Sequence, residues 1–298
     1  MLGHHVFTLW GKCQVEHNAI HCSTLLLLKT SFKERKNKLK ISIITISFNQ
    51  ADYLKKCIDS VLSQNIKDLE YIVVDPGSTD GSREIIEAYG DKLIKVFEKD
   101  AGAADGLNKG FSRATGEIFG FINSDDELLP GALEKVADAF LKNSQAGAIS
   151  GCGYFVDASG AFLKSITPSQ FTPWRYVHGA VSVFQQGTFF RSDWFRKVGG
   201  FNTDNRTCWD GELFLGMALA GAHFKTIGEE LAIFRLHEAS ITGSGRLNEL
   251  YAMDADRLFR SALKRPRSER DRYIDILAKL RKWLFEPSWL IRRIARLR

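Results

Sequence analysis

The first half of the chain alternates between short apolar runs and segments whose apolar residues recur at helical spacing. Continuous apolar runs of four to six residues are typical of parallel strands buried on both faces, whereas a three- and four-residue spacing indicates amphipathic helices. We predict strands at 41–46, 71–74, 93–97 and 118–122, and helices at 51–64, 82–89, 104–114 and 133–141. Strands and helices that alternate with short connections form βαβ units, so we expect an α/β fold with a mostly parallel central sheet flanked by helices.

After residue 146 the apolar runs become shorter and less regular. They predict strands at 148–150, 154–156, 161–163 and 187–190, and a helix at 210–220. Asp157-Ala158-Ser159-Gly160 lies between two of these strands and has the composition of a hairpin turn. This change of pattern predicts a second half, 146–245, that differs in architecture from the half formed by 41–145.

The two ends of the chain lie outside this pattern. Residues 1–40 show no clear period and end in a charged stretch, so we expect a poorly ordered lead-in. From Lys264 to residue 298 there are twelve Lys and Arg residues but only four acidic residues. This excess of positive charge is larger than the net charge of +6 on the whole chain. We therefore predict a basic helical tail over 246–298. The remainder is slightly acidic, which argues against nucleic acid as a partner.

Cysteine usage and hydropathy indicate a cytoplasmic protein. The five cysteines are scattered without a C-x-x-C pair, which argues against both a disulfide framework and a zinc site. No apolar run reaches the ~18 residues of a membrane span, and the leucine run at 25–28 lacks the flanks of a signal peptide.

The basic tail has two interpretations that the sequence leaves open. Its predicted helix at 273–285 places Asp275, Lys279, Lys282 and Glu286 along one polar stripe. Aromatic and basic residues would suit peripheral contact with anionic lipid on the inner face of the cytoplasmic membrane; they are Trp283, Trp289, Arg292, Arg293, Arg296 and Arg298. The alternative is a helix packed on its own catalytic domain or on a second subunit.

Polar residues gather where the predicted parallel strands end, which is where such sheets bind ligands. Asp125 and Asp126 close the strand at 118–122. Two adjacent carboxylates repel each other unless a cation lies between them, and their hard oxygen atoms suit Mg²⁺ or Mn²⁺ bridging to a diphosphate. The alternative is that one of them caps a following helix.

Two further loops could contact a nucleotide. In the stretch 75–82, Gly77 and Gly81 allow a ligand to approach the backbone, and the Asp75 carboxylate could accept from a base or a ribose. Ser78, Thr79 or Asp80 could instead cap the next helix, and we favour this interpretation for these three residues. The stretch 100–110 opens a helix whose N–H groups could bind phosphate, and Lys109 could pair with a phosphate oxygen or lie on a solvated face.

Candidate groups for the chemical step lie in the second half. Asp210 and Glu212 begin a mostly apolar helix, where the helix dipole alone would stabilise negative charge. Either could instead act as a general base for an acceptor hydroxyl. His237 could complete a metal shell, although a lone histidine is more often a satisfied polar residue.

Taken in order, these stretches resemble the family 2 inverting glycosyltransferases with the GT-A fold, whose central sheet is Rossmann-like. The resemblance covers roughly residues 40–243. The segments that carry it are ISIITISFNQ at 41–50, 71–82, EKDAG at 98–102, NKG at 108–110, ATGEI at 114–118, NSDD at 123–126, QGTFFR at 186–191 and VGGF at 198–201.

The resemblance implies roles for individual residues. Asp75 would contact the uracil or ribose of a UDP-sugar, Asp125 would lie near the ribose, and Asp126 would ligate the metal, with His237 as a further ligand. Asp210 matches the catalytic base, with Glu212 beside it. The remaining residues expected at the nucleotide-sugar are Ser47, Asn49, Ser78, Asp105, Lys109 and Asn123.

The sequence also departs from the family pattern. Pro76 stands where many members carry a second acidic residue, and Ile46 where many carry Pro or Thr. No Q-x-x-R-W motif follows Asp210, which argues against a processive enzyme. We expect transfer from a nucleotide-sugar to a glycan or lipid-linked acceptor in cell-surface polysaccharide or lipopolysaccharide synthesis. The alternatives are a catalytically lapsed nucleotide-sugar-binding protein and a sugar nucleotidyltransferase, although the latter would need a glycine-rich loop after the first strand.

Overall fold

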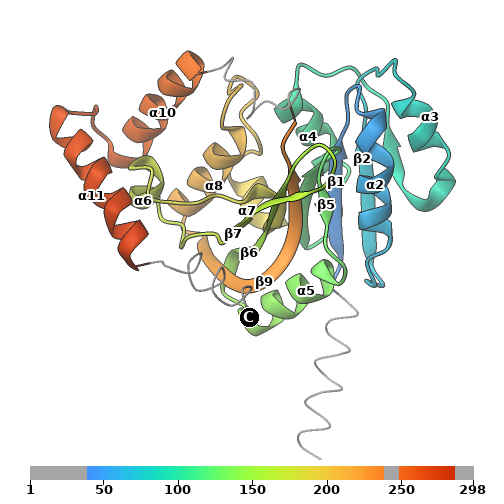
Figure 1. Ribbon diagram of the computed structural model, residues 1–298, viewed down its shortest axis with the longest axis horizontal. Coiled ribbons are helices and arrows are strands. Elements are labelled where there is room, and N and C mark those ends of the chain that lie inside the picture. The colour runs from blue at the N-terminus through green and yellow to red at the C-terminus, as the bar shows by residue number, and fades with distance from the viewer. Residues whose placement is uncertain (1–38, 238–247, 286–298) are drawn as a thin grey trace, which may run out of the picture.

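The computed structural model describes residues 39–237 and 248–285, and one continuous mixed sheet forms its centre (Figure 1). Its first half is parallel, with strand order β3 (Ile94–Val96), β2 (Leu69–Val74), β1 (Ile41–Ile46) and β4 (Ile118–Asn123). The connecting helices are α2 (Ala51–Leu62), α3 (Ser82–Glu87) and α4 (Ala103–Phe111), with a 3₁₀ turn η1 (Gly90–Lys92) before β3. The predicted α/β fold with its four parallel strands is confirmed.

The second half of the sheet joins antiparallel and parallel strands. Strand β8 (Thr188–Arg191) lies antiparallel to β4, β6 (Ala146–Val156) antiparallel to β8, and β9 (His223–Arg235) parallel to β6. The short β5 (Glu127–Leu128) pairs with β9, and β7 (Phe162–Ile166) forms a hairpin with β6. Two strands that we predicted separately, 148–150 and 154–156, are one strand, and β9 was not predicted.

The two faces of the sheet carry separate apolar cores. Successive residues of β1 alternate between them, since Ile43 packs into one core and Ile44 into the other. The first core is covered by α2 and by α5 (Ala132–Lys142). The second is covered by α4, α7 (Ser192–Lys197), α8 (Trp209–Leu219) and α10 (Asn248–Leu263). In α4, a Cβ on Gly110 would lie 2.7 Å from Ile44 Cγ2, so only glycine allows this helix to lie so close to β1.

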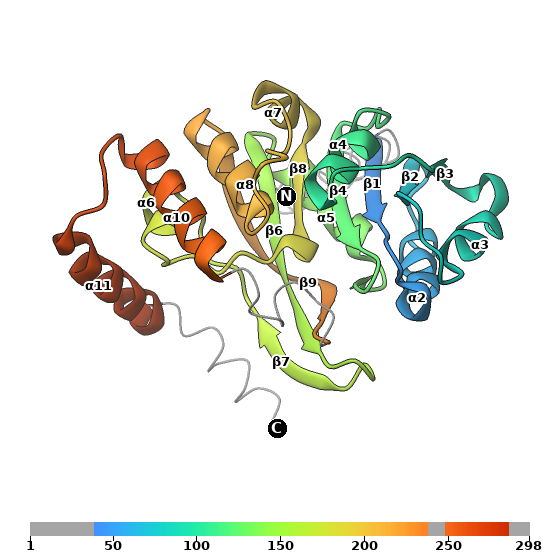
Figure 2. The same cartoon turned by 90° about the horizontal axis from the view of Figure 1, so that it is seen from above.

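The C-terminal helices pack against the rest of the protein. Helix α10 contacts α8 and α6 (Pro173–Val177), and its residues Leu258 and Phe259 are buried in the same core as Phe214. Helix α11 (Glu269–Phe285) follows along the outside of α10 (Figure 2). The segment that we expected to be a tail from residue 246 therefore begins with a helix that completes the core. Of our further predictions, the lead-in at 1–38 and the residues beyond 285 lie outside the described part of the chain.

None of the helices in the described ranges combines the length and apolar character of a bilayer-spanning segment.

Candidate active site

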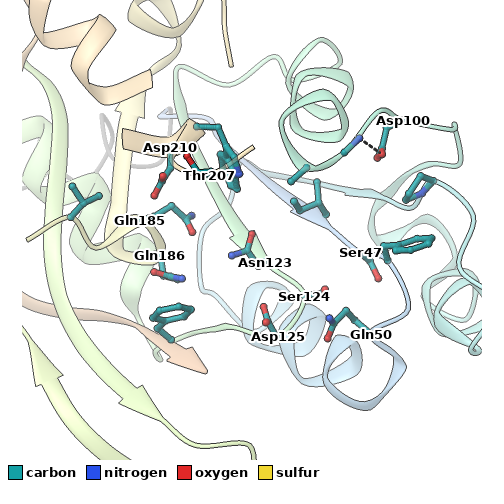
Figure 3. A pocket seen from close by; sticks show the side chains of 18 of the residues that line it. Ser47, Gln50, Asp100, Asn123, Ser124, Asp125, Gln185, Gln186, Thr207 and Asp210 are labelled. Carbon is teal, nitrogen blue, oxygen red and sulfur yellow. Dashed lines mark hydrogen bonds between the residues drawn. The ribbon is translucent and has the colours of Figure 1, made fainter. Parts of the chain in front are cut away.

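A cavity of about 850 Å³ opens at the carboxyl ends of β1 and β4, where the parallel half of the sheet meets the antiparallel half (Figure 3). Its first wall comes from the loops that follow the parallel strands; it includes Ser47, Pro76, Asp100, Asn123 and Asp125. Its second wall comes from β6, β9, α8 and the 3₁₀ turn η2 (Gln185–Gly187); it includes Phe155, Phe184, Gln185, Gln186, Trp209, Asp210 and Phe234. A cavity of this size accommodates a ligand with a volume of several hundred cubic ångströms.

The two adjacent acids after β4 have different surroundings. Asp125 lines the cavity, and its Oδ2 lies 2.9 Å from Nε2 of His237. Asp126 is fully buried: its Oδ1 accepts from the backbone N–H of Arg235 (2.9 Å), and its Oδ2 accepts from the amides of Gln186 (2.8 Å) and Asn123 (3.3 Å). Burial and the neighbouring charge of Asp125 raise the pKa of Asp126. Our expectation placed Asp126 at the metal and Asp125 at the ribose, yet it is Asp125 that faces the cavity.

Arg235, at the end of β9, fixes the turn that carries both acids. Beside its backbone bond to Asp126, its guanidinium donates to the carbonyls of Asp125 (3.0 Å) and Asp157 (3.2 Å) and pairs with Glu127. Only 2% of Arg235 is exposed, so this charge is held by a full set of partners. We did not predict this role, although Arg235 stands in the same stretch as His237.

Asp125 and His237 are the side chains placed to hold a divalent cation. Within the described ranges, no cluster of three or more His, Cys, Asp or Glu side chains could enclose a metal ion. The Asp125 carboxylate at the cavity wall and the imidazole of His237, 2.9 Å from it, nevertheless form a partial donor set. Mg²⁺ in particular is commonly bound by one or two carboxylates together with substrate phosphates and water. These two groups therefore fit a cation that takes its remaining ligands from a diphosphate.

The ends of β1 and β2 each carry a buried polar atom that has no hydrogen-bond partner among the described residues. Asp75 is fully buried, and its Oδ1 accepts from the N–H groups of Gly77 and Ser78 and from Nε of Arg83 (2.8–3.0 Å). Its Oδ2 and the Oγ of Ser47 have no hydrogen-bond partner in the described part of the chain. An unsatisfied buried polar atom costs about 1–3 kcal/mol, so a pair of them indicates a place where a ligand supplies the partners.

Five of the residues expected at the nucleotide-sugar do not line the cavity: Asn49, Asp75, Ser78, Asp105 and Lys109. Asp75 lies fully buried next to the lining residue Pro76. The backbone N–H of Asn49 donates to Oγ of Ser78 (2.8 Å), and Oδ1 of Asn49 accepts from the next loop in return, so these two residues tie the loops after β1 and β2 together. Nζ of Lys109 donates to Asp105 (2.8 Å) and to the carbonyl of Lys99, which stabilises the start of α4. The remaining expected contacts, Ser47, Asn123 and Asp125, do line the cavity.

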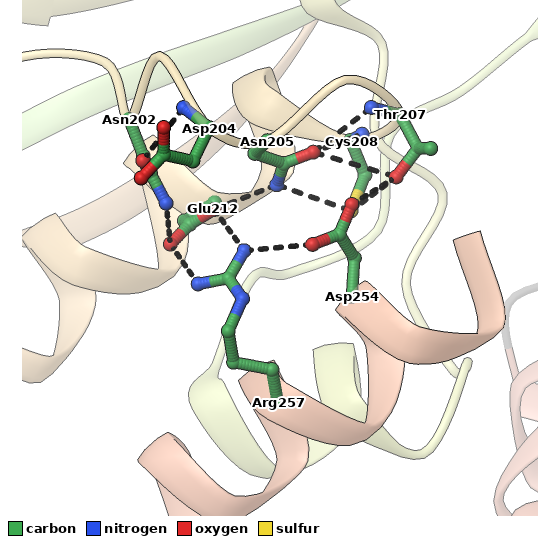
Figure 4. A network of polar contacts seen from close by, with 8 residues as sticks. All are labelled: Asn202, Asp204, Asn205, Thr207, Cys208, Glu212, Asp254 and Arg257. Carbon is green, nitrogen blue, oxygen red and sulfur yellow. Dashed lines mark hydrogen bonds and ion pairs between the residues drawn. The ribbon is translucent and has the colours of Figure 1, made fainter. Parts of the chain in front are cut away.

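Asp210 and Glu212 are two residues apart on α8, so they point to opposite faces of the helix and have different surroundings. Asp210 points into the cavity from the start of α8, and burial raises its pKa (Figure 3). Glu212 does not line the cavity. It accepts hydrogen bonds from Arg257, Asn205 and Asn202 (Figure 4). Burial alone would raise the pKa of Glu212, but these bonds outweigh it and the pKa is lowered.

The Glu212 network joins α8 to α10. Arg257 on α10 also pairs with Asp254 (3.0 Å), whose carboxylate accepts from the hydroxyl of Thr207 (2.7 Å) in the loop before α8 (Figure 4). Glu212 therefore joins the two helices, and Asp210 is the one of the two acids that lines the cavity.

Several cavity residues were not singled out from the sequence. The side-chain amide of Gln185 donates a hydrogen bond to the carbonyl of Phe121 (2.7 Å). The next residue, Gln186, donates its own to Asp126. An adjacent pair of amides directly before an apolar strand was the available signal. The aromatic wall had no such signal, because its members are isolated apolar residues in separate elements.

Comparison with known proteins agrees with this geometry. Residues 42–199 match the family model described as glycosyl transferase family 2. An uncharacterized glycosyltransferase of Nostoc is 31% identical over 68% of this chain and 66% of its own length. A Bacillus subtilis protein assigned to teichuronic acid biosynthesis as the glycosyltransferase TuaG is 38% identical over 37% of this chain and 46% of its own length. The chain thus spans about two thirds of the length of the Nostoc relative.

Solved structures show the same fold. The Staphylococcus aureus protein TarS, in complex with UDP-GlcNAc, superposes with a TM-score of 0.62 at 17% identity, covering 81% of this chain and 70% of that one. The mannosyltransferase PcManGT of Pyrobaculum calidifontis, in complex with GDP-Man and Mn²⁺, gives a TM-score of 0.57 at 19% identity, covering 94% and 84%. The fold is thus that of the GT-A glycosyltransferases. Together with the match over more than half of its residues, this shows that the chain belongs to glycosyl transferase family 2.

Proposed function

We propose that the chain is an inverting, metal-dependent glycosyltransferase that moves a sugar from a nucleotide-sugar, most simply a UDP-sugar, to an acceptor hydroxyl. The observation that carries this proposal is the pair of acids that face one cavity from different elements. Asp125, beside His237, closes a parallel strand, and Asp210 begins a helix of the other half. Asp125 would lie at the nucleotide-sugar donor, and Asp210 would lie at the acceptor hydroxyl.

The unpartnered atoms at the ends of β1 and β2 support nucleotide binding. Oδ2 of Asp75 is a buried acceptor that needs an N–H or O–H donor, and Oγ of Ser47 is available to the same ligand. Uracil offers an N–H on its pairing edge and ribose offers hydroxyls, so a uridine fits this polarity. The complex of TarS with UDP-GlcNAc supports UDP, and that of PcManGT with GDP-Man makes GDP the alternative to test.

Asp125 and His237 would hold the divalent cation, Mg²⁺ or Mn²⁺, and Asp126 would support the turn from behind. This assignment exchanges the two acids relative to our expectation from the sequence, because only Asp125 has its carboxylate at the cavity. A bound cation would neutralise negative charge on the departing diphosphate. The Mn²⁺ in the PcManGT complex supports this requirement.

Asp210 would act as the base for the acceptor. Its carboxylate takes the proton from the acceptor hydroxyl, and the hydroxyl oxygen bonds to the anomeric carbon as the bond to the diphosphate breaks on the opposite side. A single displacement of this kind inverts the anomeric configuration. The raised pKa of Asp210 makes it a stronger base than a solvated aspartate, as general-base catalysis near neutral pH requires.

One relative supports an acceptor class. The resemblance to a teichuronic acid glycosyltransferase supports a role in polysaccharide synthesis, with a glycan or lipid-linked glycan as acceptor. The apolar wall formed by Phe155, Phe184 and Phe234 is compatible with either.

The test compares Asp210→Asn with Glu212→Gln, its matched neighbour on α8. We expect Asp210→Asn to lower kcat by about 10²–10⁴-fold with unchanged UDP affinity. Glu212→Gln should lower the melting temperature and leave the chemical step largely intact. A wild-type rate in folded Asp210→Asn would remove Asp210 as the base and make Glu212 the candidate.

Two further measurements address the cation and the reaction class. Full activity and full UDP affinity after EDTA treatment would contradict the metal assignment. Release of UDP from a UDP-sugar, with the product anomer determined by NMR, separates an inverting transferase from a lapsed binding protein and from a nucleotidyltransferase, which would form pyrophosphate. A parallel screen of UDP-, GDP- and dTDP-sugars identifies the donor.

A further inference from the structure

Helix α11 turns its apolar side toward solvent. Five large apolar residues fall on one stripe of this helix, with between 50% and 71% of their surface exposed; they are Tyr273, Ile276, Leu277, Leu280 and Leu284. Their spacing of three and four residues places them on one face. Single exposed apolar residues are common on proteins, but a continuous stripe of this kind marks a surface that meets another apolar phase.

The opposite side of α11 is polar and faces the domain. Asp271 pairs with Arg265 (2.7 Å), and Asp275 pairs with Arg267 (2.7 Å) and with the buried His178 (2.6 Å). Nζ of Lys282 donates to the hydroxyl of Ser182 (2.6 Å). The polar stripe that we expected to hold Asp275 and Lys282 thus faces the domain at these two residues.

These contacts define how α11 is oriented. A surface helix of a soluble domain ordinarily buries its apolar stripe and exposes its polar one. Here ion pairs and hydrogen bonds hold the polar side inward, which leaves the apolar stripe outward. The orientation is fixed by several independent contacts, so it is a property of the fold.

Cations border the apolar stripe on both sides. By helical spacing, Arg270 and Arg281 flank one side, and Arg272 and Lys279 flank the other. All four are exposed, and none forms an ion pair with another residue of the described ranges. Asp271 and Asp275 are paired on the inward side, whereas Glu269, at the start of the helix, is exposed and lies on the outward side by helical spacing. The four cations outnumber this one acid, so the outward surface carries a net positive charge.

We propose that the outward face of α11 docks on an anionic phospholipid surface. The helix would lie in the plane of the membrane, with Ile276, Leu277, Leu280 and Leu284 at the boundary between head groups and acyl chains and the four cations at the lipid phosphates. An apolar stripe bordered by Lys and Arg is the pattern of helices that bind at such interfaces. A second copy of this chain fits the same face poorly, because it would bring two sets of unpaired cations together.

The test is co-sedimentation of the full chain with lipid vesicles. Vesicles of phosphatidylcholine alone are compared with vesicles that also contain phosphatidylglycerol. We expect binding to the anionic vesicles that weakens as salt is raised, because the cations act through screened charge. Leu277→Glu/Leu280→Glu should weaken it by tenfold or more, since two apolar side chains are lost from the interface and two like charges face the lipid.

Two variants separate the contributions. Arg270→Gln/Arg272→Gln should weaken binding to the anionic vesicles by roughly fivefold for each cation removed. The matched control is Ile94→Glu/Leu163→Glu, which changes two similarly exposed apolar residues outside α11, on β3 and β7, and should bind like the wild type. Circular dichroism melting establishes that each variant is folded.

Two results would overturn the proposal. One is that the wild type does not bind the anionic vesicles, or that Leu277→Glu/Leu280→Glu binds them as well as the wild type. The other is a wild type that sediments as a dimer in an ultracentrifuge and becomes a monomer in the Leu277→Glu/Leu280→Glu variant without any vesicle binding. That second result would make the stripe an interface between copies of the chain.

Discussion

Truncation of Phe259 tests whether α10 belongs to the cooperative core. Phe259 is fully buried, and its ring contacts the guanidinium groups of Arg267 and Arg265 at 4.3 and 5.2 Å and the ring of His178 at 5.5 Å. Replacing a buried Phe by Ala removes its apolar contacts and leaves a cavity, which costs about 3–5 kcal/mol. A kilocalorie shifts the melting temperature of a domain approaching this size by about 2–4 °C. We therefore expect Phe259→Ala to lower the melting temperature by roughly 6–20 °C.

The matched control is Tyr273→Ala on the exposed face of α11. Its aromatic ring is 71% exposed, so we expect a change in unfolding free energy within about 0.5 kcal/mol and almost no shift in melting temperature. Both variants are measured by differential scanning calorimetry at equal protein concentration. If Phe259→Ala melts within a degree or two of Tyr273→Ala, α10 does not share the core and the assignment of these helices to the domain fails.

Three further predictions concern the site and its support. In a pH profile of kcat/KM, activity should fall on acidification at a higher pH than a solvated aspartate would give, because Asp210 must be ionised to act as a base and burial raises its pKa; a profile flat down to the range of an ordinary aspartate would contradict this. Asp75→Asn should weaken UDP binding by about 10–100-fold in calorimetry, because the substitution removes a charged hydrogen-bond acceptor. The control is Asp80→Asn. It changes a loop carboxylate that is bonded only to backbone and Ser82, so UDP affinity should stay the same. Gly110→Ala should destabilise the fold by about 1–3 kcal/mol because its Cβ would lie 2.7 Å from Ile44. Gly216→Ala should instead stabilise the fold by up to about 1 kcal/mol, because its Cβ would lie no closer than 3.9 Å to any atom outside its own helix. Equal shifts in the melting temperatures of the two variants would refute the close-packing argument.

The parallel half of the sheet could be predicted because its strands are buried on both faces. Residues such as Ile43 and Ile44 alternate between two apolar cores, so nearly every position must be apolar and the run is visible in the sequence. Strand β9 lacks this property. Lys225 and Glu229 are exposed along it, and the pairing with β6 shifts register between its two ends. A long, partly covered strand with irregular register leaves no single period to detect.

The location of the acids could be predicted, but their orientation could not. Asp125 and Asp126 follow a buried strand, which is enough to place them at the ligand edge of the sheet. Which of them faces the cavity depends on the N–H of Arg235 and the amide of Gln186, which lie more than 100 and 60 residues away in the chain. These long-range contacts cannot be predicted from the residues next to Asp125 and Asp126 in the sequence.

The packing of the tail could not be predicted for a related reason. The charge surplus after Lys264 left both a membrane contact and a packed helix open, whereas the structure pairs Arg265 and Arg267 with the inward-facing acids Asp271 and Asp275 of α11. Charge counts alone do not show which residues pair across helices, so the packing of α10 and α11 emerged only from the structure.

The position of Arg235 also determines when the active site is completed during synthesis. The loops after β1 and β2 need only residues up to Arg83 for the hydrogen bonds that join them, so these bonds can form early. The acidic turn cannot, because Asp126 gains its two strongest partners only when residues 186 and 235 have left the ribosome. A nascent chain that ends before β9 therefore carries both acids in an unlocked turn. The acidic turn is thus the last part of the cavity wall to gain its hydrogen bonds, and a chain that ends between residues 83 and 235 lacks them while it retains the partners of the loops after β1 and β2.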